Sequence, residues 1–329
     1  MRIDWGRKNL RRYVQTSFLF YSLYIWYMLY LFVKHFDSGG ASPYVPYPES
    51  VDAFMPLGAL VALKNLVVNR VFDKIHPASL VILISILIIS LLYRRGFCGW
   101  ICPVGTVSEA ISNLGIKIFG RNFRIPGFLD LFMRSIKYLL LLFFLKIVVI
   151  DMNSASLMAF LQSPYYKVVA AKLLDFWINP GRLTLIFTTA IVILSLIYRN
   201  FWCRYLCPYG ALLGILGFSG VSSVKRKPEK CSDCRICTEV CSADIQIHTK
   251  NSVRSPECMA CFICIESCPN KALSFSIFGR SLNKTNFAVL LLGTFFFIIV
   301  LARLTNHWNS GIPYSEYKYL IPVRDMISH

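Results

Sequence analysis

Acidic residues are scarce in this sequence of 329 residues. It contains 17 Asp and Glu against 35 Lys and Arg, which gives a formal net charge of +18. A strongly basic chain can bind nucleic acid, but here the basic residues lie beside long apolar segments. Lys and Arg in such places set the orientation of membrane helices. The charge therefore indicates membrane topology, and we expect no nucleic-acid partner.

No cysteine lies outside a recognisable motif. All twelve cysteines belong to groups spaced for metal or redox chemistry, so none remains for a separate disulfide. This spacing favours a reducing compartment at those positions. The basic N-terminus is followed by a long apolar segment without a small-residue cleavage site, so we expect no cleavable signal peptide.

Hydrophobic residues make up 56% of the chain. Soluble domains are roughly 45–50% apolar, so the excess favours a protein embedded in membrane lipid. The positive-inside rule places the N-terminus and the cysteine-bearing loops in the cytoplasm. An apolar piece near 54–68 is too short to span and predicts a re-entrant or interfacial helix. Longer apolar segments predict about five membrane-spanning helices, near residues 14–33, 77–93, 129–150, 181–198 and 285–303.

The longest motif, Cys-x2-Cys-x2-Cys-x3-Cys, occurs at 231–241 and again at 258–268. This run is typical of bacterial ferredoxins with two 4Fe-4S clusters, in which the fourth cysteine of each run binds the other cluster. Zinc also binds Cys-x2-Cys pairs, but a doubled run of four fits a zinc site poorly. A small departure is Ser242, where the first run lacks the proline that closes the second. The predicted ligands are Cys231, Cys234, Cys237 and Cys268 for the first cluster, and Cys258, Cys261, Cys264 and Cys241 for the second.

The four remaining cysteines form an internal repeat. Its members recur 105 positions apart: Cys98 with Cys203, Cys102 with Cys207, and Pro103 with Pro208. Both copies meet the membrane in the same direction, so the repeat is parallel. Each Cys-x3-Cys is expected to place two thiols on one helical face. Two facing copies would gather four thiolates, which could hold a third iron–sulfur or metal centre, act as two redox-active dithiols, or be buried and inert.

The motifs FCGWICPVG and WCRYLCPYGAL, followed by the doubled run, resemble the NapH-type polytopic membrane ferredoxins. A similar core occurs in nitrous-oxide-reductase regulatory proteins and in oxidase-assembly ferredoxins. The resemblance covers the chain from the second span to Lys271. It implies quinol-linked electron transfer at the bacterial cytoplasmic (inner) membrane, with redox partner proteins. No flavin-attachment motif is visible, which argues against a full-length regulator of the nitrous-oxide type.

The predicted fold is a membrane all-α bundle with an internal parallel repeat and a small cytoplasmic α+β ferredoxin domain. The expected domains are the bundle at 1–221, the ferredoxin domain at 222–278, a final transmembrane helix at 279–303 and a periplasmic tail at 304–329. No residues form a constellation for substrate chemistry. We expect an electron carrier between the quinone pool or a membrane partner and a redox enzyme. The alternative is a metal-cofactor maturation reductase that uses the Cys-x3-Cys-Pro thiols.

Other polar residues near the predicted spans have two interpretations each. His76 could bind haem or contact quinone, but its counterpart in the second repeat is Asn179, so helix capping is favoured. Lys146 lies in an apolar span, where it is either functional or snorkels to the outer interface. Glu49 and Asp52 either accept quinol protons or complement a helix dipole.

Overall fold

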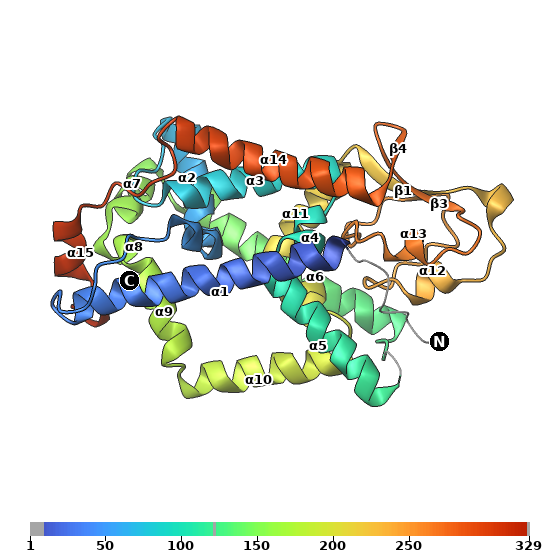
Figure 1. Ribbon diagram of the computed structural model, residues 1–329, viewed down its shortest axis with the longest axis horizontal. Helices are drawn as coiled ribbons and strands as arrows, with labels where there is room; N and C mark the ends of the chain where they lie inside the picture. Colours follow the sequence, from blue (N-terminus) through green and yellow to red (C-terminus); the bar gives the residue numbers. More distant parts are fainter. Residues whose placement is uncertain (1–9, 121–122, 328–329) are drawn as a thin grey trace. The chain divides into compact units, whose positions relative to one another are not determined.

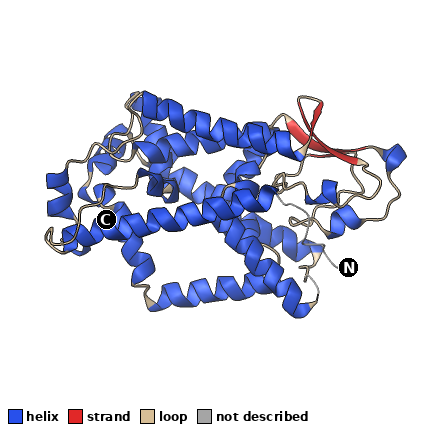
Figure 2. Cartoon of the chain, viewed as in Figure 1, coloured by secondary structure: helices blue, strands red, loops and turns tan. Residues whose placement is uncertain are grey.

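A computed structural model describes residues 10–120 and 123–327. Most of this chain is helical, and the strands are confined to one small sheet (Figure 2). The prediction of a mostly helical chain with a small sheet is confirmed. The α-helices follow one another in this order (Figure 1): α1 (Leu10–Asp37), α2 (Pro56–Asn69), α3 (Pro77–Tyr93), α4 (Gly96–Trp100), α5 (Pro103–Phe119), α6 (Gly127–Leu145), α7 (Ser154–Gln162), α8 (Pro164–Lys167), α9 (Val169–Ile178), α10 (Arg182–Ile197), α11 (Pro208–Ser219), α12 (Ile236–Glu239), α13 (Ile263–Glu266), α14 (Lys284–Leu304) and α15 (Tyr314–Leu320).

Short segments of tighter or wider helix interrupt this series. The 3-10 segments are η1 (Glu49–Phe54), η4 (Pro228–Lys230) and η5 (Arg324–Met326), and the π segments are η2 (Lys146–Asp151) and η3 (Trp202–Leu206). A single π turn inside a helical region often marks a functional site. Here η3 contains Cys203, one of the four cysteines of the internal repeat.

The sheet is antiparallel and lies in the cysteine-rich segment. Its strands β1 (Ser222–Arg226), β2 (Ser252–Val253), β3 (Leu273–Ile277) and β4 (Arg280–Leu282) have the order β2-β1-β3-β4. Val224 of β1 is opposite Phe275 of β3, and both side chains are buried. Phe278 and Gly279 link β3 to β4 with positive φ values of 47° and 81°, as a tight hairpin turn requires. The domain boundary expected at 278 therefore falls inside this hairpin.

The described chain divides into two compact units. The first comprises residues 10–20, 87–120, 123–138 and 192–294, and the second comprises 21–86, 139–191 and 295–327. All twelve cysteines lie in the first unit. The ferredoxin segment and both copies of the repeat thus belong to one compact body.

Helices occupy all five positions predicted for membrane spans, namely α1, α3, α6, α10 and α14. Among the described residues, α1 and α14 are by themselves long and apolar enough to cross a membrane. The helices α9 and α10 meet these criteria only as a pair, bent by 74°. With 17 residues, α3 is about 26 Å long, against a hydrocarbon core of about 30 Å. Length and composition therefore support two or three spans, and the short helix expected near 54–68 is present as α2.

In the second unit, His76 is fully buried and does not cap a helix with its side chain. Its Nδ1 lies 3.1 Å from Oδ1 of Asp52, and its Nε2 lies 2.9 Å from the carbonyl oxygen of Tyr166. Tyr47 donates its hydroxyl to the same Asp52 oxygen at 2.5 Å. The capping prediction is wrong because both ring nitrogens are engaged by other groups.

Lys146 lies on the surface of the second unit. Its ammonium group is 2.9 Å from Oδ2 of Asp151, and the two side chains are 63% and 45% exposed. This pairing within η2 agrees with the snorkelling interpretation, in which the charge reaches the end of an apolar helix.

Candidate functional site

The doubled cysteine run surrounds two cavities in the first unit. The cavities separate the eight cysteines into the two predicted sets. We call them the first cavity, lined by Cys231, Cys234, Cys237 and Cys268, and the second cavity, lined by Cys241, Cys258, Cys261 and Cys264. The last cysteine of each run thus lies with the first three of the other. Within residues 10–120 and 123–327, no three His, Cys, Asp or Glu side chains are close enough to hold a single metal ion.

The backbone of the two runs has the same unusual shape. Asp233 and Arg235 in the first run have φ values of 50° and 59°, and Ala260 and Phe262, 27 positions later, have values of 47° and 64°. This left-handed region is unfavourable for residues with a Cβ and persists where the surrounding structure demands it. Left-handed residues among right-handed ones turn successive N–H groups inward and form concavities that bind anions, including iron–sulfur clusters.

Backbone N–H groups also reach the cysteine sulfurs. Ile245 donates to Sγ of Cys241 at 3.4 Å, and Ala272, again 27 positions later, donates to Sγ of Cys268 at 3.3 Å. Burial raises the pKa of Cys241 to about 12. A thiolate there requires nearby positive charge, which cluster iron supplies. The thiols and the backbone of both cavities therefore fit iron–sulfur clusters.

Ser242, the departure from the run, is near the second cavity. Its hydroxyl oxygen lies 3.9 Å from Sγ of Cys261. Hydrogen bonds to cluster sulfurs help to set the reduction potential. The serine thus adds a polar contact to a cysteine of the second cavity, which a proline at this position would lack.

The four cysteines of the internal repeat, Cys98, Cys102, Cys203 and Cys207, also lie together, and we call them the repeat cysteines. Burial, together with the neighbouring Cys98 and Cys207, raises the pKa of Cys102 to about 12. Burial and the other three thiols raise the pKa of Cys203 in the same way. The N–H of Gly210 donates to Sγ of Cys207 at 3.2 Å. The structure therefore gathers both copies of the motif around one site.

The two copies of the repeat pack reciprocally. A Cβ on Gly115 would lie 1.8 Å from the carbonyl oxygen of Leu196, and a Cβ on Gly220 would lie 2.3 Å from that of Leu91. Gly115 and Gly220 are 105 positions apart, as are Leu91 and Leu196. Glycine at both places therefore permits the close backbone contact that brings the copies face to face.

The expectation that each Cys-x3-Cys shares one helical face is wrong. Cys98 lies in α4, but Cys102 has an extended backbone with φ −62° and ψ 118°. Cys207, which also precedes a proline, has φ −73° and ψ 106°. The residue before a proline is displaced from the helical region, so a helix ends between the two cysteines and the next begins at the proline.

The sequence interpretation missed a buried charge cluster beside the repeat cysteines. Nη1 of Arg95 lies 3.0 Å from Oε2 of Glu257, and Nζ of Lys137 lies 2.5 Å from Oε1. Nη2 of Arg95 donates to the carbonyl oxygen of Cys203 at 3.4 Å. Burial acts to lower the pKa of Arg95, but the neighbouring Cys98, Glu257 and other thiols raise it overall. A possible signal was the position of Glu257 directly before Cys258.

A known family of 4Fe-4S binding domains matches residues 75–126 and 181–227 of this chain. These segments are the two copies of the repeat, each with its cysteine pair. YccM of Escherichia coli (strain K12), for which a role in electron transport has been proposed, is 37% identical over 99% of this chain and 94% of its own length. The chain belongs to the NapH/NosR-type membrane ferredoxin family.

Other relatives of this membrane ferredoxin share its core. The ferredoxin-type protein NapH of Escherichia coli (strain K12) is 30% identical over 59% of this chain and 67% of NapH. The regulatory protein NosR of Stutzerimonas stutzeri is 30% identical over 53% of this chain and 23% of NosR. No solved structure matches the chain. The resemblance to NapH-type ferredoxins is confirmed, and family membership supports iron–sulfur binding and a role in electron transfer.

Proposed function

We propose that this membrane ferredoxin relays electrons between the quinone pool, or a membrane partner, and a redox enzyme. Its path comprises two 4Fe-4S clusters, held in the first and second cavities, and a third centre at the repeat cysteines. The observation that carries the proposal is the division of eight cysteines into two sets of four around cavities with the same backbone conformation. Their order along the chain is that of interlocked ferredoxin runs.

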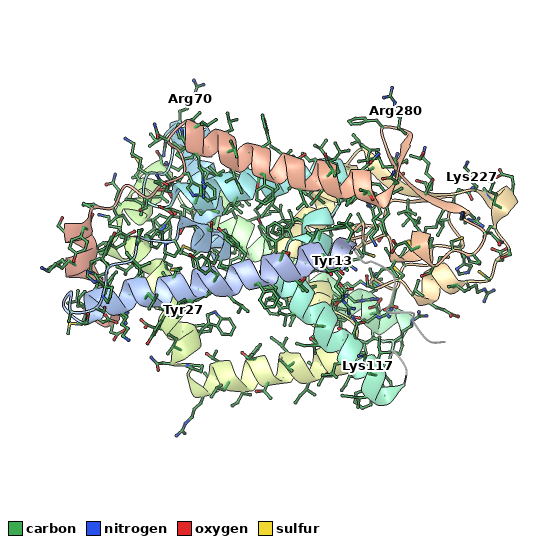
Figure 3. All side chains as sticks on the ribbon, in the orientation of Figure 1. Tyr13, Tyr27, Arg70, Lys117, Lys227 and Arg280 are labelled. Atoms are coloured by element: carbon green, nitrogen blue, oxygen red, sulfur yellow. The ribbon has the colours of Figure 1, made fainter. Side chains whose placement is uncertain are left out.

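In this proposal, α1, α3, α6, α10 and α14 cross the bacterial cytoplasmic membrane, and the cysteine-rich segment faces the cytoplasm. Lys225, Lys227, Lys230 and Lys271 of that segment are exposed, as the cytoplasmic side of a membrane protein favours. Figure 3 shows Lys227 and Arg280 at the sheet, and both are exposed. The bundle then comprises residues 1–221, and the tail 304–329 is periplasmic.

A bound iron–sulfur cluster supplies reversible exchange of one electron. The chain determines how readily that exchange occurs, through hydrogen bonds to sulfur, burial and charge. Two aromatic rings line the second cavity, those of Phe262 and Phe275, with centroids 5.2 Å apart. Cys241 and Cys264 of this cavity are buried, whereas Cys234 of the first cavity is exposed. The two clusters would therefore sit in different dielectric surroundings and differ in potential.

A ligand role for the repeat cysteines is favoured over a dithiol role. Thiol–disulfide exchange requires the thiolate, and burial together with neighbouring thiols raises the pKa values of Cys102 and Cys203. Four convergent, half-buried thiols with raised pKa values suit a bound centre better than exchange with a client protein. The maturation-reductase function depends on such exchange, so it ranks second.

The proposal is tested by iron and acid-labile sulfide analysis, with low-temperature EPR, on anaerobically purified full-length protein. Two clusters require about eight irons per chain, and clearly more indicate an occupied repeat site. Replacing all four repeat cysteines by Ser should remove the excess iron and leave the signals of two clusters. Duroquinol should reduce the clusters of the wild-type protein. Colourless protein without iron would overturn the proposal, and a variant that keeps every centre but fails to load metal into a client would favour maturation.

A further inference from the structure

Two consecutive arginines contact two different sets of cysteines. Arg94 follows α3 with a φ of 58°, in the left-handed region that often ends a helix. Burial acts to lower the pKa of Arg94, and the neighbouring Cys258 thiol of the second cavity acts to raise it. Nη2 of Arg94 donates to the carbonyl oxygen of Ser255, three residues before Cys258, at 2.6 Å. The next residue, Arg95, instead lies among the repeat cysteines and donates to the carbonyl oxygen of Cys203.

The second copy of the internal repeat has a counterpart for the first of these arginines but not for the second. Arg199 is the counterpart of Arg94, 105 positions later, and its Nη1 lies 3.3 Å from the carbonyl oxygen of Cys241. The equivalent arginines of both copies therefore reach cysteines of the second cavity. The counterpart of Arg95 is Asn200. The repeat cysteines thus receive an arginine at this position from one copy and an uncharged residue from the other.

The loop of the first cysteine pair rests directly on the loop of the second cavity. A Cβ on Gly99 would lie 2.4 Å from the carbonyl oxygen of Met259. The indole N–H of Trp100 donates to the carbonyl oxygen of Ala260 at 2.9 Å. Because Gly99 lies next to Cys98 and Met259 next to Cys258, the two cysteine sets are joined by backbone contact.

Both guanidinium groups also contain a buried N–H donor that is not hydrogen-bonded. Among the described residues, Nε of Arg94 and Nε of Arg95 have no hydrogen-bond partner, and the two residues are 1% and 3% exposed. A buried donor without a partner costs stability, and most such groups in native proteins find an acceptor. An anionic cluster with its thiolates would provide one at each position.

We propose that Arg94 and Arg95 are positioning residues that separately raise the reduction potentials of two adjoining centres. Arg94 acts on the cluster of the second cavity, and Arg95 acts on the centre at the repeat cysteines. Reduction adds negative charge to a centre, and a buried positive charge favours the more negative state. Because the loop of the first cysteine pair contacts the loop of the second cavity, the second cluster is the one that exchanges electrons with the repeat centre. The first cluster, with its exposed Cys234, is the one that meets a soluble partner.

This inference rests on the proposed function for its centres, but its test needs no quinol. Full-length protein in detergent is titrated electrochemically, and each centre is followed by EPR, with signals assigned in the variants Cys234→Ser and Cys261→Ser. Arg94→Gln should lower the equilibrium constant for reduction of the second cluster about tenfold, which is about 59 mV for one electron. Arg95→Gln should do the same to the repeat centre. In each variant, the equilibrium constant for reduction of the other centre should stay within about threefold of its wild-type value.

Two controls separate charge from structure. Arg94→Lys and Arg95→Lys keep the charge and should restore most of the potential, whereas a purely structural role would not be rescued. Arg226→Gln alters a residue that lines the first cavity, so it should shift the first cluster alone. The inference is overturned if Arg94→Gln and Arg95→Gln shift the same centre, or if neither shifts any.

A measurement on protein that keeps both arginines leaves the inference testable if an arginine variant fails to fold. When the second cluster is reduced, its spin should broaden the EPR signal of the repeat centre. The broadening should survive in Cys234→Ser, which alters a ligand of the first cluster, and disappear in Cys261→Ser. The reverse pattern would place the first cluster beside the repeat centre and refute the proposed order. A protein without iron would instead refute the proposed function itself.

Discussion

Glu257→Gln is expected to destabilise the protein strongly. The Glu257 side chain is 6% exposed and contacts two buried cations, Arg95 at 3.0 Å and Lys137 at 2.5 Å. Removing one member of a buried pair leaves charge without compensation and costs about 3–5 kcal/mol. Because glutamine still offers an amide oxygen as an acceptor, we expect a loss of about 3 kcal/mol, near the lower end.

The assay is reversible unfolding of anaerobic protein in mixed detergent micelles. The matched control is Asp151→Asn, which breaks the exposed pair with Lys146 and should cost at most about 1 kcal/mol. Adding Lys137→Met to Glu257→Gln should recover part of the loss, because one of the two buried cations is then gone. Equal effects of Glu257→Gln and Asp151→Asn would refute the reasoning.

The remaining predictions concern packing and pH. Gly115→Ala should destabilise the protein by about 1–3 kcal/mol, because the added methyl group crowds Leu196. A Cβ on Gly293 would have no other atom within 4 Å, so Gly293→Ala should stabilise α14 by up to about 1 kcal/mol. Thermal unfolding of both variants tests these two predictions. Burial acts to lower the pKa of His76, but Asp52 and a backbone carbonyl raise it above its ordinary value of 6.5. The stabilising contribution of the charged His76 is therefore complete below pH 6.5 and is lost as the pH rises through the raised pKa. His76→Gln should make the melting temperature fall less steeply from neutral to alkaline pH. An equally steep fall in the variant would contradict this.

The arrangement of the cysteines could be predicted because it depends on local spacing. Cys231, Cys234 and Cys237 lie on one loop. Their short spacing along the chain places three thiols around a common point, independently of distant contacts. The fourth cysteine of each set follows from the interlocking of two runs, and the first cavity includes Cys268. Helix positions followed for a similar reason, since apolar runs of sufficient length predict helices without knowledge of their partners.

Features that depend on distant contacts could not be predicted. Arg95 is 162 positions from Glu257, and Lys137 is 120 positions from it. From the sequence, Arg95 resembles any basic residue at the end of an apolar helix. His76 was misjudged for the same reason, because its partner Asp52 is 24 positions away and belongs to another element. The extended backbone of Cys102, in contrast, followed from Pro103 by a local rule that the helical-face expectation overlooked.

The symmetry of the repeat and its departure from symmetry at Arg95 together indicate how the centres are ordered. Gly115 and Gly220 make equivalent contacts in the two copies, so the two copies pack against each other in a matching way. Two matching copies would give the repeat centre the same field from both sides, but Arg95 adds a positive charge from one copy only. Glu257, which partly neutralises that charge, directly precedes Cys258 of the second cavity. If both proposed centres are bound, a change of charge at the second cluster would act on the same buried ions that lie beside the repeat cysteines. The two centres should then influence each other's potential more strongly than either influences the first cluster.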